Sequence, residues 1–128
     1  MAVGGFTAVG AALTGAVLAQ GQLATSGTTP IYGPVPANTY VKIAKVVLSN
    51  VTASALTVSY GAVKSGGTVN ADATLQGKDV PLGAKGSTTA ILDATELGGM
   101  MLGPGDSIGA LASTGTACTY TVSGSVSS

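Results

Sequence analysis

The chain has 128 residues, a length that suits a single domain. Hydrophobic residues make up 45% of it and charged residues only 8%, whereas soluble domains usually carry about 25% charged residues. A lone monomer with so few charges would expose a poorly solvated surface. The composition therefore indicates either a membrane protein or a protein whose surface is covered by neighbouring subunits.

The distribution of charge argues against a membrane or nucleic acid partner. The most apolar stretch, residues 8–19, is interrupted by Gly10, Thr14 and Gly15, and a spanning helix needs roughly 20 apolar residues. The first cation is Lys42, so no basic export signal is expected. Five lysines balance five acids without arginine or histidine, which leaves no basic patch for phosphates. We therefore expect a surface covered by other proteins.

The N-terminal part divides into an arm and the start of a β domain. Residues 1–16 are mostly small, with Phe6 as the large side chain, which is typical of a flexible tail or an extended arm that docks on a neighbour. Residues 17–128 are expected to form the β domain. Within residues 17–35, one side of a possible strand carries Leu18, Gln20, Gln22 and Ala24. The next segment contains Pro30, Pro34 and Pro36. Because proline has no backbone N–H to donate to a neighbouring strand, this segment is predicted to be an edge strand or an extended connector.

The strand predicted at residues 39–50 changes parity along its length. Val41 and Ile43 share one face, but the next apolar pair, Val46 and Leu48, has the opposite parity. One extra residue near position 44 or 45 would produce this change, which is the mark of a β-bulge. The alternative is a strand that is buried on both faces.

Residues 54–63 show the cleanest alternation and predict a half-buried strand. One side carries Leu56, Val58, Tyr60 and Ala62, and the other carries Ala55, Thr57, Ser59 and Gly61. Residues 50–53 separate this strand from the one before it. We therefore expect the two strands to form an antiparallel hairpin.

The rest of the chain predicts short strands separated by turns. Residues 64–85 are expected to be a long loop with one short strand, followed by strands at 87–93 and 106–112 and a turn with a brief strand at 96–102. Pro104 and Gly105 fit the centre of a type II turn. In residues 115–126, an inward face of Cys118, Tyr120 and Val122 alternates with an outward face of Ala117, Thr119, Thr121 and Ser123. The fold class predicted is all-β, an antiparallel β-sandwich or jelly-roll-like fold.

Catalysis is not expected from these residues. The chain has no histidine, and its acids are scattered over loops and strand ends at Asp72, Asp79, Asp93, Glu96 and Asp106. Asp93 and Glu96 are spaced to meet across a turn, but solvated or turn-capping roles are expected for them. Cys118 is expected to be a small buried hydrophobic residue rather than a nucleophile. We predict that the chain is not an enzyme and has no catalytic residues.

Metal, cofactor and ligand sites are not expected either. Calcium accepts carboxylates such as Asp93, Glu96 and Asp106, but no spaced Asp/Asn motif supports such a site. Tyr60 and Tyr120 are expected in the core, and Tyr32 and Tyr40 are expected to pack against the proline-rich connector rather than to stack on a ligand. Three lysines, Lys42, Lys45 and Lys64, are expected around the exposed side of the first hairpin. They either protect the sheet edge from unwanted strand pairing or contact an acidic partner surface, and the sequence leaves both roles open.

The order of these segments resembles that of small virion proteins of tailed bacteriophages. The resemblance covers residues 17–125 and is carried by VPANT at 35–39, SNVTASALTV at 49–58, LGPGDSI at 102–108 and YTVSG at 120–124. Such proteins are β-sandwich modules that decorate heads, serve as minor capsid proteins, or belong to tails and fibres. The family has no catalytic residues to transfer to this chain.

The resemblance implies a virion structural protein, and foremost a capsid decoration or minor capsid protein that cements neighbouring subunits. It implies major capsid or tail proteins as partners, a homo-oligomer such as a trimer, and a place in virions assembled in the host cytoplasm. A tail accessory or fibre-associated module is the first alternative. The second is a carbohydrate- or host-surface-binding sandwich with a shallow site around Asp72, Asp79 and Asp93.

Overall fold

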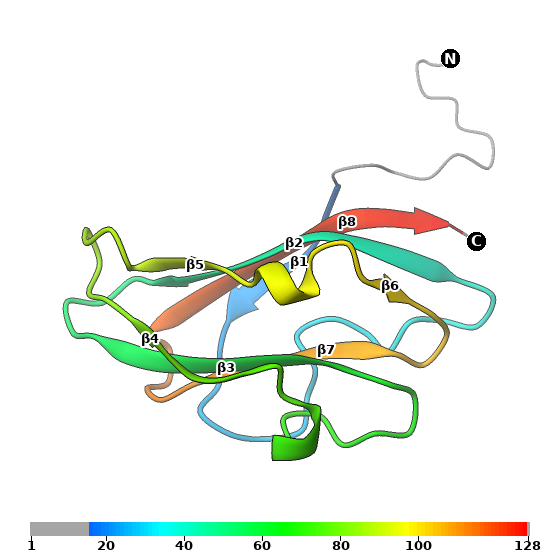
Figure 1. Ribbon diagram of the computed structural model, residues 1–128, viewed down its shortest axis with the longest axis horizontal. Helices are drawn as coiled ribbons and strands as arrows, with labels where there is room; N and C mark the ends of the chain where they lie inside the picture. The colour runs from blue at the N-terminus through cyan, green and yellow to red at the C-terminus, as the bar shows by residue number, and fades with distance from the viewer. Residues whose placement is uncertain (1–15, 128) are drawn as a thin grey trace, which may run out of the picture.

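The computed structural model describes residues 16–127, which form two antiparallel β-sheets packed face to face (Figure 1). The predicted all-β sandwich is confirmed. The predicted arm lies outside the described residues except for Ala16, which begins the first strand. The elements in chain order are β1 (Ala16–Gln22), β2 (Tyr40–Asn50), β3 (Leu56–Val63), η1 (Asp72–Thr74), β4 (Gly77–Leu82), β5 (Ile91–Asp93), η2 (Thr95–Leu97), β6 (Met101–Leu102), β7 (Ser107–Ala112) and β8 (Cys118–Ser127).

The larger sheet has five strands and is built around β2. Its order is β1-β8-β2-β5, and β6 also pairs with β2. The bulge predicted in β2 is confirmed, because its pairing with β8 shifts register between Ile43 and Lys45. The shift lets the apolar residues on both sides of it face the core, so that Val41, Ile43, Val46 and Leu48 are all buried.

The hairpin predicted between β2 and β3 is wrong. β3 lies in the second sheet, between β4 and β7, so the connection after β2 crosses from one sheet to the other. The buried Asn50 holds this connection in place. Its Nδ2 donates to the carbonyl oxygens of Ser54 at 2.8 Å and Gly83 at 2.9 Å, and its Oδ1 accepts from the backbone N–H of Thr52 at 2.9 Å.

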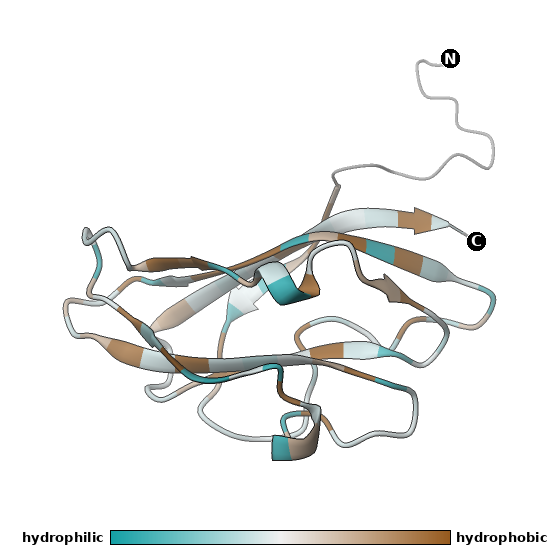
Figure 2. Ribbon diagram, in the orientation of Figure 1, coloured by the Kyte–Doolittle hydropathy of each residue, from teal (hydrophilic) through white to brown (hydrophobic). Residues whose placement is uncertain are grey.

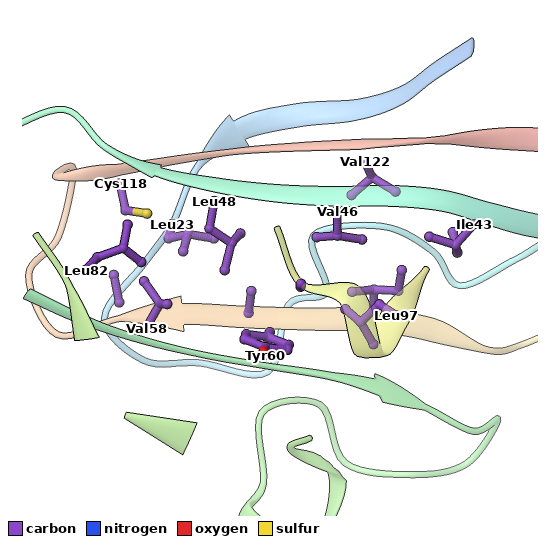
Figure 3. Packing of buried hydrophobic residues seen from close by; sticks show 14 of the residues in the cluster. Leu23, Ile43, Val46, Leu48, Val58, Tyr60, Leu82, Leu97, Cys118 and Val122 are labelled. Atoms are coloured by element: carbon purple, nitrogen blue, oxygen red, sulfur yellow. The ribbon is translucent and has the colours of Figure 1, made fainter. Parts of the chain in front are cut away.

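The core fills the space between the two sheets (Figure 3). Figure 2 shows the hydrophobic residues of β2 and β3 alternating with more polar ones along each strand. The segment containing η2 lies between the sheets and contributes the buried side chains of Ala94 and Leu97. Cys118 and Val122 of β8 are buried as predicted, but Ala117 is buried too. Ala117 precedes β8, so the alternation of that strand does not apply to it.

The outer side of the three-stranded sheet is covered by the chain itself. Ser59 and Gly61 were predicted to face outward from a half-buried strand, yet both are buried. Gly61 pairs with Gly109 across β3 and β7. A side chain on Gly61 would meet the carbonyl oxygen of Thr74, and one on Gly109 would lie 2.6 Å from Oδ1 of Asn70. These two glycines therefore let the loop at residues 64–76 pack on the sheet.

The connecting segments mostly follow the sequence-based expectations. The proline-rich connector has no strand and pairs with β7 through a single bridge between Tyr32 and Ile108. Gly105 has φ +85° and the N–H of Asp106 donates to the carbonyl of Gly103 at 3.0 Å, as the predicted turn requires. Leu18 was predicted to lie on the same side of its strand as Gln20 and Gln22. The pairing of β1 with β8 shifts register after Val17, and Leu18 packs against the core instead.

Within residues 16–127 there is no helix with the length and apolar character needed to cross a membrane.

Candidate functional site

The acidic residues singled out in the sequence are not brought together. The carboxylate of Asp93 lies 3.6 Å from Nζ of Lys45, whereas Glu96 accepts a hydrogen bond from the hydroxyl of Tyr60. Asp106 accepts hydrogen bonds from the backbone N–H groups of Gly103 and Ser65, both at 2.9 Å. Each acid thus has a separate local partner, and the Asp93–Glu96 pair is not formed. In the described part of the chain, no three His, Cys, Asp or Glu side chains are grouped in a way that would hold a metal ion.

The shallow ligand site expected around three aspartates is also not assembled. Asp72 lies in η1 and its carboxylate is 3.0 Å from Nζ of Lys78, while Asp79 lies in β4. Both belong to the part of the molecule with the three-stranded sheet. Asp93 lies in β5 of the other sheet, and among residues 16–127 no three acidic side chains are grouped closely enough to hold an ion.

The nucleophile and aromatic candidates are mostly part of the core. Cys118 has no exposed surface, and burial raises the pKa of its thiol, which disfavours the reactive thiolate. Tyr60 is buried, and Tyr120 and Tyr32 pack against the core. Burial also raises the pKa of Tyr32. Tyr40 is the exception, because 53% of it is exposed.

The lysines do not surround one hairpin as predicted. Lys42 and Lys45 lie on β2 in the five-stranded sheet, whereas Lys64 directly follows β3 in the other sheet. They are separated because β2 and β3 do not pair with each other.

The most distinctive surface is the side of the five-stranded sheet that faces away from the core, here called the outer face. Its residues are identified by strand register. Leu48 and Asn50 point inward, so Ser49 and its partner Ile91 point outward. The same alternation shows that Met101, Tyr40 and Val17 also point outward. Met101 is paired with Lys42, Tyr40 with Ser127 and Val17 with Ser123.

Exposed large hydrophobic residues gather on this face. Ile91 is 65% exposed, Val17 and Met101 are 60% exposed, and Tyr40 is 53% exposed. Another exposed hydrophobic residue of the described region, Val51, follows directly after β2. Figure 2 shows β5 and β6 as hydrophobic strands beside β2. Isolated exposed apolar residues are common on soluble proteins, but their concentration on one sheet face is typical of an interaction surface.

The centre of the outer face is polar but small and nearly uncharged. The outward residues of β8 are all threonine or serine, namely Thr119, Thr121, Ser123, Ser125 and Ser127. The five strands of this sheet carry only three charged residues, Lys42, Lys45 and Asp93, and the last two form the ion pair described above. Little desolvation of charge would therefore oppose the covering of this face.

A hollow lies at one end of the outer face. It has a volume of about 430 Å³ and is lined by Tyr40, Lys42, Met101, Ser125 and Ser127. The two serines are small, which leaves space beside the larger side chains of Tyr40 and Met101. Tyrosine and methionine are enriched where proteins contact one another. The hollow thus has the composition of a place that receives a side chain from another protein.

The sequence pointed to the strands of this face but not to its exposed apolar residues. Ile91 and Leu92 are adjacent apolar residues in a three-residue strand, and Met101 and Leu102 form a two-residue strand. Alternation cannot show which of two neighbouring apolar residues points outward in so short a segment. The low charge of the whole chain was the available signal that some surface would be covered.

Comparisons of the chain with protein-family models, curated proteins and solved structures found no match.

Proposed function

We propose that this chain is a structural subunit of a bacteriophage virion, foremost a capsid decoration or minor capsid protein that packs against neighbouring subunits. The observation that carries the proposal is the outer face, on which Val17, Tyr40, Ile91 and Met101 are exposed together. The similarity of the segment order to virion proteins of tailed phages supports the virion setting.

The contrast between the two sheets supports the choice of surface. The loop at residues 64–76 covers the outer side of the three-stranded sheet and fills the space above Gly61 and Gly109. The five-stranded sheet has no such cover among residues 16–127. Burial of its apolar side chains against other subunits would supply the driving force for assembly.

The proposed mechanism is cementing. A protein that binds only the assembled shell lowers the free energy of that state by mass action, so the shell becomes harder to take apart. The described side chains support a structural rather than a catalytic role. Asp93, Glu96 and Asp106 each have a local partner, and the thiol of Cys118 is buried.

The experiment is to add the purified chain to phage particles that lack it. Saturable binding to shells, together with higher heat or osmotic stability of the particles, is the expected result. Replacement of the exposed Ile91 by aspartate would place a charge on the outer face and is expected to abolish binding. The matched control is Ala73→Asp, because Ala73 is exposed in η1, which lies below the three-stranded sheet in Figure 1.

The outcomes separate the alternatives. Binding confined to tails would assign the chain to the tail accessory class. Particles that bind no protein, or that gain no stability when the protein is bound, would contradict cementing.

A further inference from the structure

The outer face carries a projecting side chain and a hollow at opposite ends of β2. Ile91 is the most exposed large hydrophobic residue of this face and lies level with Ser49. The hollow includes Met101, which lies level with Lys42. Lys42 and Ser49 are seven positions apart in β2, and one of these positions belongs to the bulge, so the two levels are about 20 Å apart along the strand.

A two-fold axis relates such a pair of features in a simple way. Consider an axis that lies along the face and crosses β2 close to a right angle, between the two levels. Rotation about it places each end of β2 over the opposite end of β2 in the other copy. In two copies stacked face to face, Ile91 of each copy then lies over the hollow of the other. This is the arrangement of an isologous interface, in which residue i contacts j and j contacts i.

The charges of the face are compatible with this arrangement. Lys45 lies near the midpoint of β2, and Asp93 is level with Val47, close to the same point. The axis therefore brings the Lys45–Asp93 ion pairs of the two copies near each other, so that positive and negative charges are both present at the centre of the interface. It places the two Lys42 side chains at opposite ends of the interface, where they do not repel each other strongly.

We propose that a second copy of this chain docks on the outer face, with Ile91 of each copy in the hollow beside Met101 of the other. This inference deepens the proposed assembly role, on which it rests, by naming the partner of the same face. A partner of different sequence would need only one of the two features, whereas here one face carries both. The chain as a whole has no net charge, so its copies do not repel one another.

The two-fold contact closes with two copies. The proposal therefore expects a dimer, although the resemblance to virion proteins implies a homo-oligomer such as a trimer. Two exposed sheets of this kind pack with their strands inclined by about 30°, because each sheet is twisted. The contact of Ile91 with the hollow then fixes the register of the stack.

The first test is the mass of the full chain in solution, measured by light scattering and sedimentation over a range of concentrations. The wild type is expected to be a dimer. Ile91→Asp is expected to raise the dissociation constant at least about tenfold, because an apolar contact that occurs twice in the dimer is replaced by a buried charge. Ala73→Asp is expected to leave the dimer intact. Thermal unfolding of each variant verifies that the fold is retained.

The second test is site-directed cross-linking, which examines the register itself. Ile91→Cys and Met101→Cys variants are prepared separately, mixed and oxidised. The mixture is expected to form a disulfide-linked dimer far more readily than either variant alone, because position 91 faces position 101 of the other copy. The native Cys118 is buried and does not compete. Cross-linking of Ile91→Cys with itself would overturn the proposed axis.

Other outcomes identify other occupants. A wild-type monomer at all concentrations, or a trimer unaffected by Ile91→Asp, would overturn the dimer. If a chain lacking residues 1–15 loses the dimer while Ile91→Asp keeps it, the N-terminal segment makes the contact instead. A dimer that ignores phage particles would leave this inference standing and contradict the proposed function, whereas a monomer that binds particles would do the reverse.

Discussion

The hydroxyl of Tyr60 donates a 2.8 Å hydrogen bond to Oε1 of Glu96, and this bond connects the two halves of the sandwich. Tyr60 lies on β3 of the three-stranded sheet, and Glu96 lies in η2, between the strands β5 and β6 of the other sheet. The ring of Tyr60 is buried among the core residues near Leu97 (Figure 3). The bond therefore fixes how η2 sits over β3.

This hydrogen bond predicts a loss of stability at alkaline pH. Burial, and then the contact with Glu96, raise the pKa of Tyr60 to about 12, compared with about 10 for an exposed tyrosine. Because the pKa of Tyr60 is higher in the folded than in the unfolded state, the neutral hydroxyl of Tyr60 contributes its full stabilisation below pH 10. This stabilisation is lost as the pH rises towards 12. The free energy of unfolding is expected to fall by about 2 kcal/mol over this window.

Urea unfolding at pH 7, 10 and 11.5 measures this effect. Tyr60→Phe is expected to show a shallower pH dependence, because it retains the ring but has no group to ionise. Glu96→Gln should keep part of the wild-type dependence, since burial, the first of the causes, still raises the pKa of Tyr60. Equal slopes for the wild type and Tyr60→Phe would contradict the assignment.

Asp106 predicts a complementary loss of stability in acid. The backbone N–H of Gly103, and then that of Ser65, lower the pKa of its carboxyl group. Because the folded-state pKa is lowered, its contribution is present above the unfolded pKa of about 4 and is lost as the pH falls through the folded value. Asp106→Asn is expected to cost about 1–2 kcal/mol at pH 7, where the charged acceptor is lost.

Unfolding of Asp106→Asn and the wild type at pH 7 and pH 3 tests this expectation. The difference between them should shrink at pH 3, because this pH lies below the unfolded-state pKa of about 4 and the stabilising contribution of the carboxylate is already decreasing there. Asp79→Asn serves as the control, because Asp79 is also an aspartate but is exposed on β4. A difference that is the same at both pH values would show that the charge of Asp106 is not responsible.

The close packing of the loop at residues 64–76 over Gly61 leads to a further prediction. A methyl group at this position would meet the backbone of Thr74, which cannot move away as easily as the end of a flexible side chain. Gly61→Ala is expected to cost about 1–3 kcal/mol, as is typical of overpacking. Hydrogen exchange in residues 64–76 is expected to speed up, because the loop is pushed from the sheet.

The matched control for this substitution is Gly115→Ala. At Gly115 the nearest atom to an added methyl group is Cγ2 of Thr25 at 3.5 Å, an ordinary contact distance. Its stability is expected to stay within about 0.5 kcal/mol of the wild type, as for most surface substitutions. Equal effects of the two substitutions would mean that the cover over β3 is not held by close packing at Gly61.

The features that could be predicted from the sequence are those encoded within one strand. The change of parity around Ile43 and Val46 revealed the bulge in β2, and alternation located β3 and β8. Alternation reports which side chains point inward, but it does not report which strand lies alongside. The pairing of β2 with β8 rather than β3 depends on contacts between residues far apart in the sequence, as does the bond between Tyr60 and Glu96.

The candidate site shows the same limit. Low charge indicated that some surface would be covered, but it did not locate that surface. The outer face became visible only when register showed that Ile91 and Met101 point away from the core. The long loop at residues 64–85 was predicted, yet its packing over Gly61 depends on a contact with Thr74 that no local pattern contains.

The change of sheet between β2 and β3 predicts a large effect of removing the Asn50 side chain. Asn50 is buried, and its amide group joins Thr52, Ser54 and Gly83, so it connects the turn to the segment that follows β4. Asn50→Ala would remove the buried amide that donates to the carbonyl oxygens of Ser54 and Gly83. Each lost hydrogen bond costs about 0.5–1.5 kcal/mol, so we expect a decrease of about 1–3 kcal/mol in the free energy of unfolding.

Asn50→Asp is a sharper version of the same test. Aspartate has the same shape and can still accept from the N–H of Thr52, but its carboxylate cannot donate to the carbonyls of Ser54 and Gly83. At pH 7 it is expected to destabilise the fold at least as much as alanine does, and protonation at low pH should restore part of the loss. A wild-type melting temperature for Asn50→Asp at pH 7 would mean that the two donor bonds do not hold the crossing between the sheets.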